Sequence, residues 1–146
     1  MRRIAVVGLA TVALVCALGA LAAARSRRPA LQLRATRLGR ILVDSRGYTV
    51  YAFTRDRRNQ DACARIPNCL AAWPVVGPSR PLAGPGVKAR LIGTIRLRGG
   101  VRQLTYAGHP LYTYIGDSRP AQTTYVNLLQ FGGRWPALTA SGREVR

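Results

Sequence analysis

The chain carries one short unit twice, and this duplication is the feature that most constrains its fold. A motif of two aromatic residues and an aspartate, Tyr-x-(Phe/Tyr)-x-x-Asp, occurs in both halves, and a Trp-Pro pair follows each copy. The two copies are Tyr51, Phe53, Asp56 with Trp73-Pro74, and Tyr112, Tyr114, Asp117 with Trp135-Pro136. A repeated unit of this length predicts two similar halves that pack against each other in one domain.

The residues around each motif are typical of short strands. Ile41-Leu-Val43 and the run from Tyr48 to Phe53 are β-branched or aromatic and are separated by Asp-Ser-Arg-Gly, which predicts a hairpin. In the second half we expect strands at 91–97, 103–106 and 111–114. After the uncharged apolar stretch at residues 4–24, no long segment has apolar residues at the 3.6-residue period of a helix, and one helical turn is expected at 127–131. The sequence therefore predicts a mostly β, small single domain of two hairpin-containing repeats.

The N-terminus predicts export from the cytoplasm. Met1-Arg-Arg3 precedes an uncharged apolar stretch that ends at Ala24, the pattern of a signal peptide with cleavage after Ala24. The alternative is an uncleaved signal anchor, because such a stretch would span about 30 Å as a helix. An anchor would give membrane association; the protein is expected to be extracytoplasmic in either case, secreted or held at the outer face of the cytoplasmic membrane.

Composition divides the rest of the chain. Residues 25–37 are basic and are expected to form an irregular tether, and the duplicated β domain is expected to occupy 38–146. Its first repeat is placed at about 39–75 and its second at about 91–138. A Pro- and Gly-rich loop at 76–90 separates them.

The charge of the chain is strongly positive. Its 23 basic residues, all arginine except Lys88, face five acids and give a net charge of +18. Such a charge attracts polyanions, and outside the membrane these are anionic lipid or cell-wall polymer. Nucleic acid is not an expected partner, because the arginines are scattered and not interleaved with aromatic residues. The alternative interpretation is a solvated surface whose arginines reflect compositional bias alone.

The motif residues have a structural and a functional interpretation. Asp56 and Asp117 each follow a predicted strand end, where a carboxylate usually accepts hydrogen bonds from turn N–H groups. The functional alternative is that the two aspartates jointly bind a cation or act as an acid and base pair. Trp73 and Trp135 are expected to anchor the core, with a ligand-stacking platform as the alternative.

Two cysteines and one histidine complete the candidates. Cys63 and Cys69 are expected to form a disulfide in an oxidising compartment, with a metal site as the weaker alternative. His109 lies in a predicted turn, where backbone or solvent would satisfy it; the alternative is a metal or haem ligand. His109 and Tyr106 are the candidate ligand-binding residues. No metal, cofactor or catalytic residue is predicted.

Together these residues resemble the bacterial family described as secreted repeats of unknown function, or predicted lipoproteins with a conserved Tyr-x-(Phe/Trp/Tyr)-x-x-Asp motif. The resemblance runs from about residue 39 to 142 and includes Leu91-x-Gly93-Thr, Tyr106-x-Gly108-His-Pro and Phe131-Gly-x-x-Trp135 besides the motifs above. The chain departs from the family in lacking a lipobox, in having five residues between the cysteines, and in having Val75 after Trp-Pro. The resemblance implies a cell-envelope location and no established activity.

The expected function is that of a non-enzymatic envelope protein, of uncharacterised role, which binds anionic envelope components. The alternative is an accessory protein in extracytoplasmic redox or metal handling that uses Asp56, Asp117 and His109 beside an aromatic platform of tyrosines 106, 112 and 114. A hydrolase is disfavoured, because one histidine and five acids leave little from which to build a catalytic pair.

Overall fold

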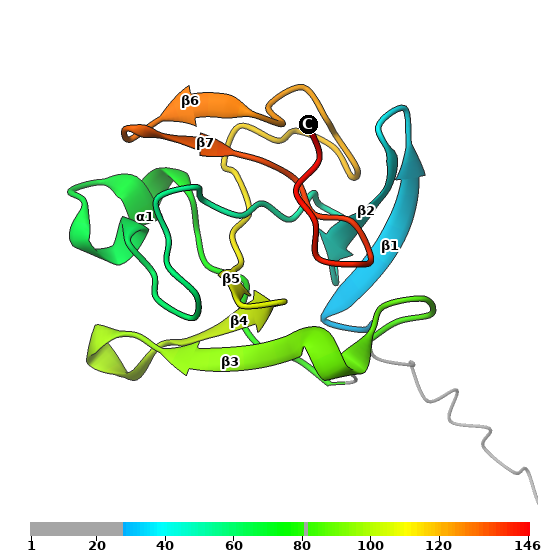
Figure 1. Cartoon of the computed structure of the whole chain (residues 1–146), viewed down its shortest axis with the longest axis horizontal. Coiled ribbons are helices and arrows are strands. Elements are labelled where there is room, and N and C mark those ends of the chain that lie inside the picture. The colour runs from blue at the N-terminus through cyan, green and yellow to red at the C-terminus, as the bar shows by residue number, and fades with distance from the viewer. Residues whose placement is uncertain (1–27, 81) are drawn as a thin grey trace, which may run out of the picture.

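Short antiparallel strands and turns make up the protein, as a computed structural model that describes residues 28–80 and 82–146 shows (Figure 1). The strands are β1 (Leu31–Thr36), β2 (Gly39–Asp44), β3 (Ile92–Arg96), β4 (Arg102–Tyr106), β5 (His109–Pro110), β6 (Leu128–Gln130) and β7 (Gly133–Trp135). The helices are one turn each: α1 (Cys69–Ala72) and the 3-10 helices η1 (Cys63–Arg65), η2 (Ala89–Leu91) and η3 (Arg98–Gly100). The mostly β prediction is confirmed.

Three small sheets surround the core. β1 pairs with β2, β3 with β4 and β4 with β5, and β6 with β7, all antiparallel (Figure 1). Isolated bridges pair further segments that lie outside these strands, among them Tyr51 with both Tyr112 and Ala137, and Val75 with Tyr112, while Thr139 bridges to Ile41 of β2. The centre of the fold is thus held by single bridges between segments far apart in the sequence.

The two halves share their strand order. β2 and β4 are the equivalent strands that precede each motif, and β1 and β3 are their antiparallel partners: Leu33 faces Leu42 in the first pair, and Thr94 faces Leu104 in the second. Leu31, Leu42 and Leu104 are fully buried in one core cluster, so both strand pairs turn a face to the same interior. The duplication therefore includes β1.

The position of β1 corrects the predicted tether. Residues 31–36 are not irregular; they form a six-residue strand, and the domain begins before residue 38. The physical reason is the alternation Leu31-x-Leu33, which gives β1 an apolar face, while Arg34 is exposed. Residues 1–24, assigned to the leader, and residues 25–27 of the tether lie outside the described residues.

Two other local predictions are changed. The predicted helical turn at 127–131 is wrong: Leu128–Gln130 is strand β6, because its backbone pairs with β7 and Leu128 lies opposite Trp135. The strand expected at 111–114 is reduced to bridges at Tyr112, whereas the strands expected at 91–97 and 103–106 are present as β3 and β4.

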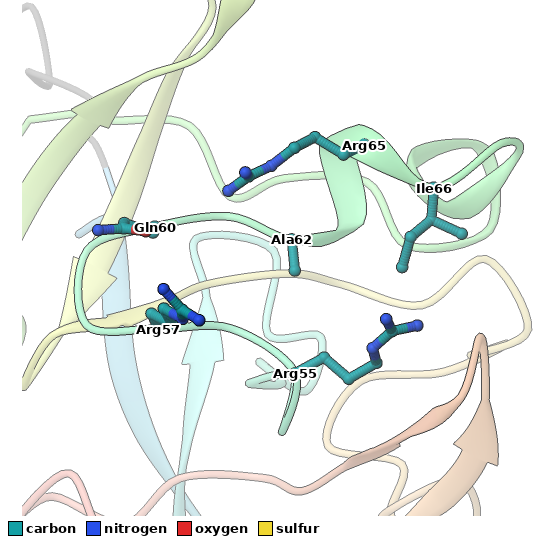
Figure 2. Close-up of a pocket in the computed structure, with 6 residues that line it drawn as sticks. All are labelled: Arg55, Arg57, Gln60, Ala62, Arg65 and Ile66. Carbon is teal, nitrogen blue, oxygen red and sulfur yellow. The ribbon is translucent and has the colours of Figure 1, made fainter.

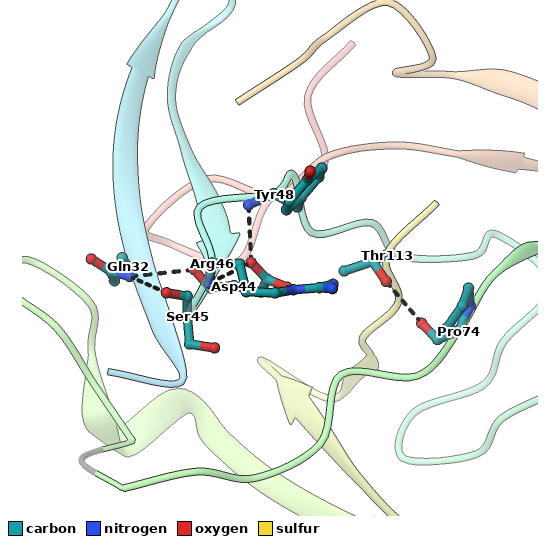
Figure 3. A network of polar contacts seen from close by, with 7 residues as sticks. All are labelled: Gln32, Asp44, Ser45, Arg46, Tyr48, Pro74 and Thr113. Atoms are coloured by element: carbon teal, nitrogen blue, oxygen red, sulfur yellow. Dashed lines mark hydrogen bonds and ion pairs between the residues drawn. The ribbon is translucent and has the colours of Figure 1, made fainter. Parts of the chain in front are cut away.

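The turn predicted after β2 is held by its own aspartate (Figure 3). Asp44 Oδ1 accepts hydrogen bonds from the backbone N–H of Arg46 and of Tyr48, each at 2.9 Å. Gly47 has φ +92°, the left-handed conformation that favours glycine. Val50 N then donates to Leu42 O, which returns the chain along β2. Within the described residues no helix is long and apolar enough to span a bilayer.

Candidate functional site

The two motifs meet at the centre of the molecule. Tyr51 and Tyr112 form a reciprocal backbone pair, with N to O distances of 2.8 and 3.0 Å. Asp56 N donates to Phe53 O, and Asp117 N donates to Tyr114 O, so the same turn follows each copy. This equivalence confirms that the two motif segments adopt matching conformations, as expected from a duplicated unit.

Each motif tyrosine binds the aspartate of the other copy. The Tyr51 hydroxyl donates to Asp117 at 3.0 Å, and the Tyr112 hydroxyl donates to Asp56 at 2.9 Å. Asp56 also accepts from Ala62 N at 2.7 Å, the turn contact that the sequence predicts. The motif is therefore a reciprocal clasp, in which the hydroxyl of each motif tyrosine is hydrogen-bonded to the aspartate of the other copy.

Aromatic rings fill the space beneath this clasp. The rings of Trp73 and Trp135 stack, with their centroids 3.8 Å apart and an interplanar angle of 3°. Phe53 stacks on the outer face of Trp135 at 4.1 Å, and Tyr114 stacks on Trp73 at 4.2 Å. Both tryptophans are fully buried, so they anchor the core and do not form a ligand-stacking surface.

The motif aspartates are held in environments that favour the neutral acid. Burial raises the pKa of Asp56 to about 7, against the opposing effect of the hydrogen bonds from Ala62 N and Tyr112. Burial likewise raises the pKa of Asp117 to about 6, although the hydrogen bond from Tyr51 opposes it. Burial also raises the pKa of both tyrosines, so they remain protonated donors.

These pKa shifts predict that stability falls as the pH rises. A carboxyl whose pKa is higher in the folded state binds its proton more tightly there than in the unfolded chain. Its contribution to the free energy of unfolding is therefore complete below its unfolded pKa, near 4, and is lost as the pH rises through the folded pKa values of about 6 and about 7. We expect the free energy of unfolding to drop by on the order of 1–3 kcal/mol between about pH 5 and about pH 8. This energy is smaller than the pKa shifts alone would give, because solvent partly screens both carboxyls. Urea denaturation across this interval measures it.

The control for the pH prediction is the double variant Asp56→Asn, Asp117→Asn, whose side chains do not titrate. Its free energy of unfolding should change less over the same interval than that of the wild-type chain. A wild-type stability that stays level or rises from about pH 5 to about pH 8 would contradict burial of these carboxyls as the cause.

The remaining sequence candidates have separate positions. Cys63 and Cys69 form the expected disulfide, with Cα atoms 5.3 Å apart, and close the loop after Asp56. Tyr106 is fully buried, and its hydroxyl donates to Ala140 O at 2.8 Å and accepts from Lys88 N. It therefore packs in the core, with its hydroxyl held by two backbone groups.

His109 begins β5 and is half-buried. It lines a small hollow of about 240 Å³ together with Asp56, Arg57 and Arg58. The described part of the chain contains no group of three or more His, Cys, Asp or Glu side chains placed to hold a metal ion. The aromatic platform considered for a metal or redox role is not a surface, because Tyr106 and Tyr112 are fully buried.

Three arginines line a pocket that was not predicted from the sequence. Arg55 and Arg57 come from the segment after the first motif strand, and Arg65 comes from η1 across the opening (Figure 2). Gln60, Ala62 and Ile66 complete the lining of this pocket, which has a volume of about 400 Å³. Arg65 and Ile66 lie within the loop that the disulfide closes, so this loop forms one wall of the pocket.

In the part of the chain that the structure describes, the pocket arginines form no ion pair, although the charge of Arg65 acts on Asp56 and partly opposes the rise in the pKa of that carboxyl. Within residues 28–80 and 82–146 the ion pairs are Arg46 with Asp44 and Arg134 with Glu144. Arg55 donates only to a carbonyl, Phe131 O at 3.1 Å, and is exposed. Like charges in one opening repel each other, so a bound anion would stabilise this arrangement.

Comparison with known proteins identifies the duplicated unit. The model of a family described as "Secreted repeat of unknown function" matches the chain twice, at residues 33–77 and 93–139. The first match begins within β1, which agrees with the strand order of the two halves. Neither a curated protein nor a solved structure matches the chain. The duplicated clasp and the two family matches together show that the chain belongs to the family of secreted repeats of unknown function and is an extracytoplasmic protein.

Proposed function

We propose that this protein is a non-enzymatic envelope protein that binds an anionic component of the cell envelope through the pocket of Arg55, Arg57 and Arg65. The observation that carries the proposal is that these three arginines line one pocket and form no ion pair in the described residues. Guanidinium groups bind phosphate and carboxylate oxygens in bidentate geometry. The ligand class is therefore a phosphate- or carboxylate-bearing lipid or wall polymer.

The clasp supports a binding role and not a catalytic one. Asp56 and Asp117 are the two acids that a catalytic acid and base pair would require. Each of them accepts a hydrogen bond from a buried tyrosine of the other copy. Their side chains therefore hold the halves together. The fold of the pocket depends on this clasp, because Arg55 and Arg57 flank Asp56 in the chain.

Replacing the pocket arginines tests the proposal. The triple variant Arg55→Gln, Arg57→Gln, Arg65→Gln should bind vesicles containing phosphatidylglycerol, or a soluble polyanion, at least about tenfold more weakly at low salt. Wild-type binding should fall steeply as salt shortens the screening length to about 3 Å near 1 M. Sedimentation with vesicles at low and high salt measures both effects.

The matched control removes the same charge elsewhere. Arg34, Arg37 and Arg40 lie on or between β1 and β2, are all exposed, and lie on the other side of the molecule from α1 (Figure 1). Their replacement by glutamine should weaken binding far less than the pocket variant does. Equal losses would show that diffuse charge, and not the pocket, attracts the anion; no binding at low salt would overturn the proposal entirely.

A further inference from the structure

An apolar hollow adjoins the arginines. Leu70 of α1 and Val75 face Leu97 and Val101, which flank η3, and together with Ala64, Pro74 and Arg98 they line a volume of about 340 Å³. Val101 is 50% exposed, one of the few large apolar side chains that the described part of the surface leaves so open. The lining of this hollow thus joins α1 to the segment that follows β3.

A middle hollow connects the apolar one to the arginine pocket. Its lining shares Leu97 and Arg98 with the apolar hollow, and Gln60 and Arg65 with the arginine pocket. It has a volume of about 610 Å³ and adds Arg96, which is exposed, and Asp61, which is buried. The Asp61 carboxylate accepts a hydrogen bond from Ala64 N, and Arg65, Arg96 and Arg98 outnumber this one acid in the lining of the hollow. The three hollows thus adjoin one another through these shared residues, and together they are called the groove, which is arginine-rich at one end and apolar at the other.

The chemistry of the groove selects its occupant. A small inorganic anion would occupy the arginines and leave the apolar lining in water, whereas a hydrocarbon would cover the apolar lining and leave Arg65, Arg96 and Arg98 unpaired. A molecule with a phosphate at one end and an acyl chain at the other satisfies both ends. The guanidinium groups match phosphate geometry, and each methylene that leaves water strengthens binding by about fourfold.

We propose that this groove binds a single molecule of an anionic glycerophospholipid, with the phosphate against Arg65, Arg96 and Arg98 and an acyl chain against Leu70, Val75, Leu97 and Val101. The inference rests on the proposed function, because Arg65 lines both the arginine pocket and the adjoining hollow that takes the phosphate. It adds a requirement that charge alone does not impose: the ligand carries an apolar chain. The protein would then hold a lipid molecule in its own groove and not only lie on a charged surface.

Calorimetric titration with two soluble probes tests the inference. Dihexanoyl phosphatidylglycerol, kept as monomers, carries phosphate and short acyl chains, and glycerol 3-phosphate carries the phosphate alone. The wild-type protein should bind the lipid at least about tenfold more tightly than glycerol 3-phosphate, because several methylenes leave water. Equal affinities would overturn the inference and leave anion binding intact. Failure of both probes and of the vesicles would overturn the proposed function, and the inference with it.

A pair of matched variants locates the acyl chain. Val101→Ser should weaken binding of the lipid by about threefold or more and leave binding of glycerol 3-phosphate unchanged, because it removes apolar surface from the groove. Leu129→Ser is the control, since Leu129 is 79% exposed on β6 and lies outside the groove. Lipid affinity that is the same in wild type, Val101→Ser and Leu129→Ser would overturn the assignment of the chain to this hollow.

Discussion

Replacement of Trp135 by alanine is expected to lower the free energy of unfolding by about 3–5 kcal/mol. Trp135 is fully buried and stacks between Trp73 and Phe53, at 3.8 and 4.1 Å, while the edge of Tyr112 contacts it at 5.1 Å. Its Nε1 donates to Gln130 O at 3.1 Å. Alanine removes all of these contacts and leaves a cavity between the two halves, and a domain of this size has only about 5–15 kcal/mol of stability in total. Urea denaturation followed by circular dichroism measures the loss.

The control for this variant is an aromatic residue at the end of the same cluster. Tyr125 contacts only the edge of Tyr114 among the rings, at 4.9 Å, and is half-buried. Tyr125→Ala should therefore cost about 1 kcal/mol. If Trp135→Ala and Tyr125→Ala lower the stability by similar amounts, the ring stack is not the structural centre of the fold.

Much of the clasp was predictable from the sequence, and its pairing was not. The repeated spacing of Tyr51 and Asp56 with Tyr112 and Asp117 predicts two equivalent segments, which the structure confirms. It does not say that each tyrosine binds the aspartate of the other copy, because this depends on how the two halves face each other. The reciprocal Tyr51 and Tyr112 backbone pair decides that arrangement.

The errors have local physical causes. The apolar residues around Leu128 are too few to show whether their spacing is that of a strand or of a helical turn. The pairing of this segment with β7 makes it a strand. The basic composition of residues 25–37 suggests a tether and hides the strand β1, although the alternation Leu31-x-Leu33 is a usable signal for it. The arginine pocket is built from one short stretch, because Arg55, Arg57 and Arg65 all lie between residues 55 and 65, but the sequence does not show that this stretch folds back to enclose a pocket.

A chain that begins at Leu38, the boundary suggested by composition, is expected not to fold. It lacks β1, which is the ladder partner of β2 along its whole length, from Leu31 opposite Asp44 to Thr36 opposite Gly39. It also loses a fully buried leucine, whose removal alone typically costs about 2–5 kcal/mol. Circular dichroism and urea denaturation should show no cooperative transition.

A chain that begins at Arg28 is the control, because it retains β1 and its contacts with the 82–84 segment, where Leu31 N donates to Leu82 O and Gly84 N donates to Leu31 O. It should unfold cooperatively, since it keeps every described residue. A chain beginning at Leu38 that folds with the same transition would show that β1 is dispensable. Deleting residues 25–37 would remove the core strand β1 together with the arginines of that segment. The contribution of the basic N-terminal residues to anion binding is therefore measured by comparing the full chain with the chain that begins at Arg28.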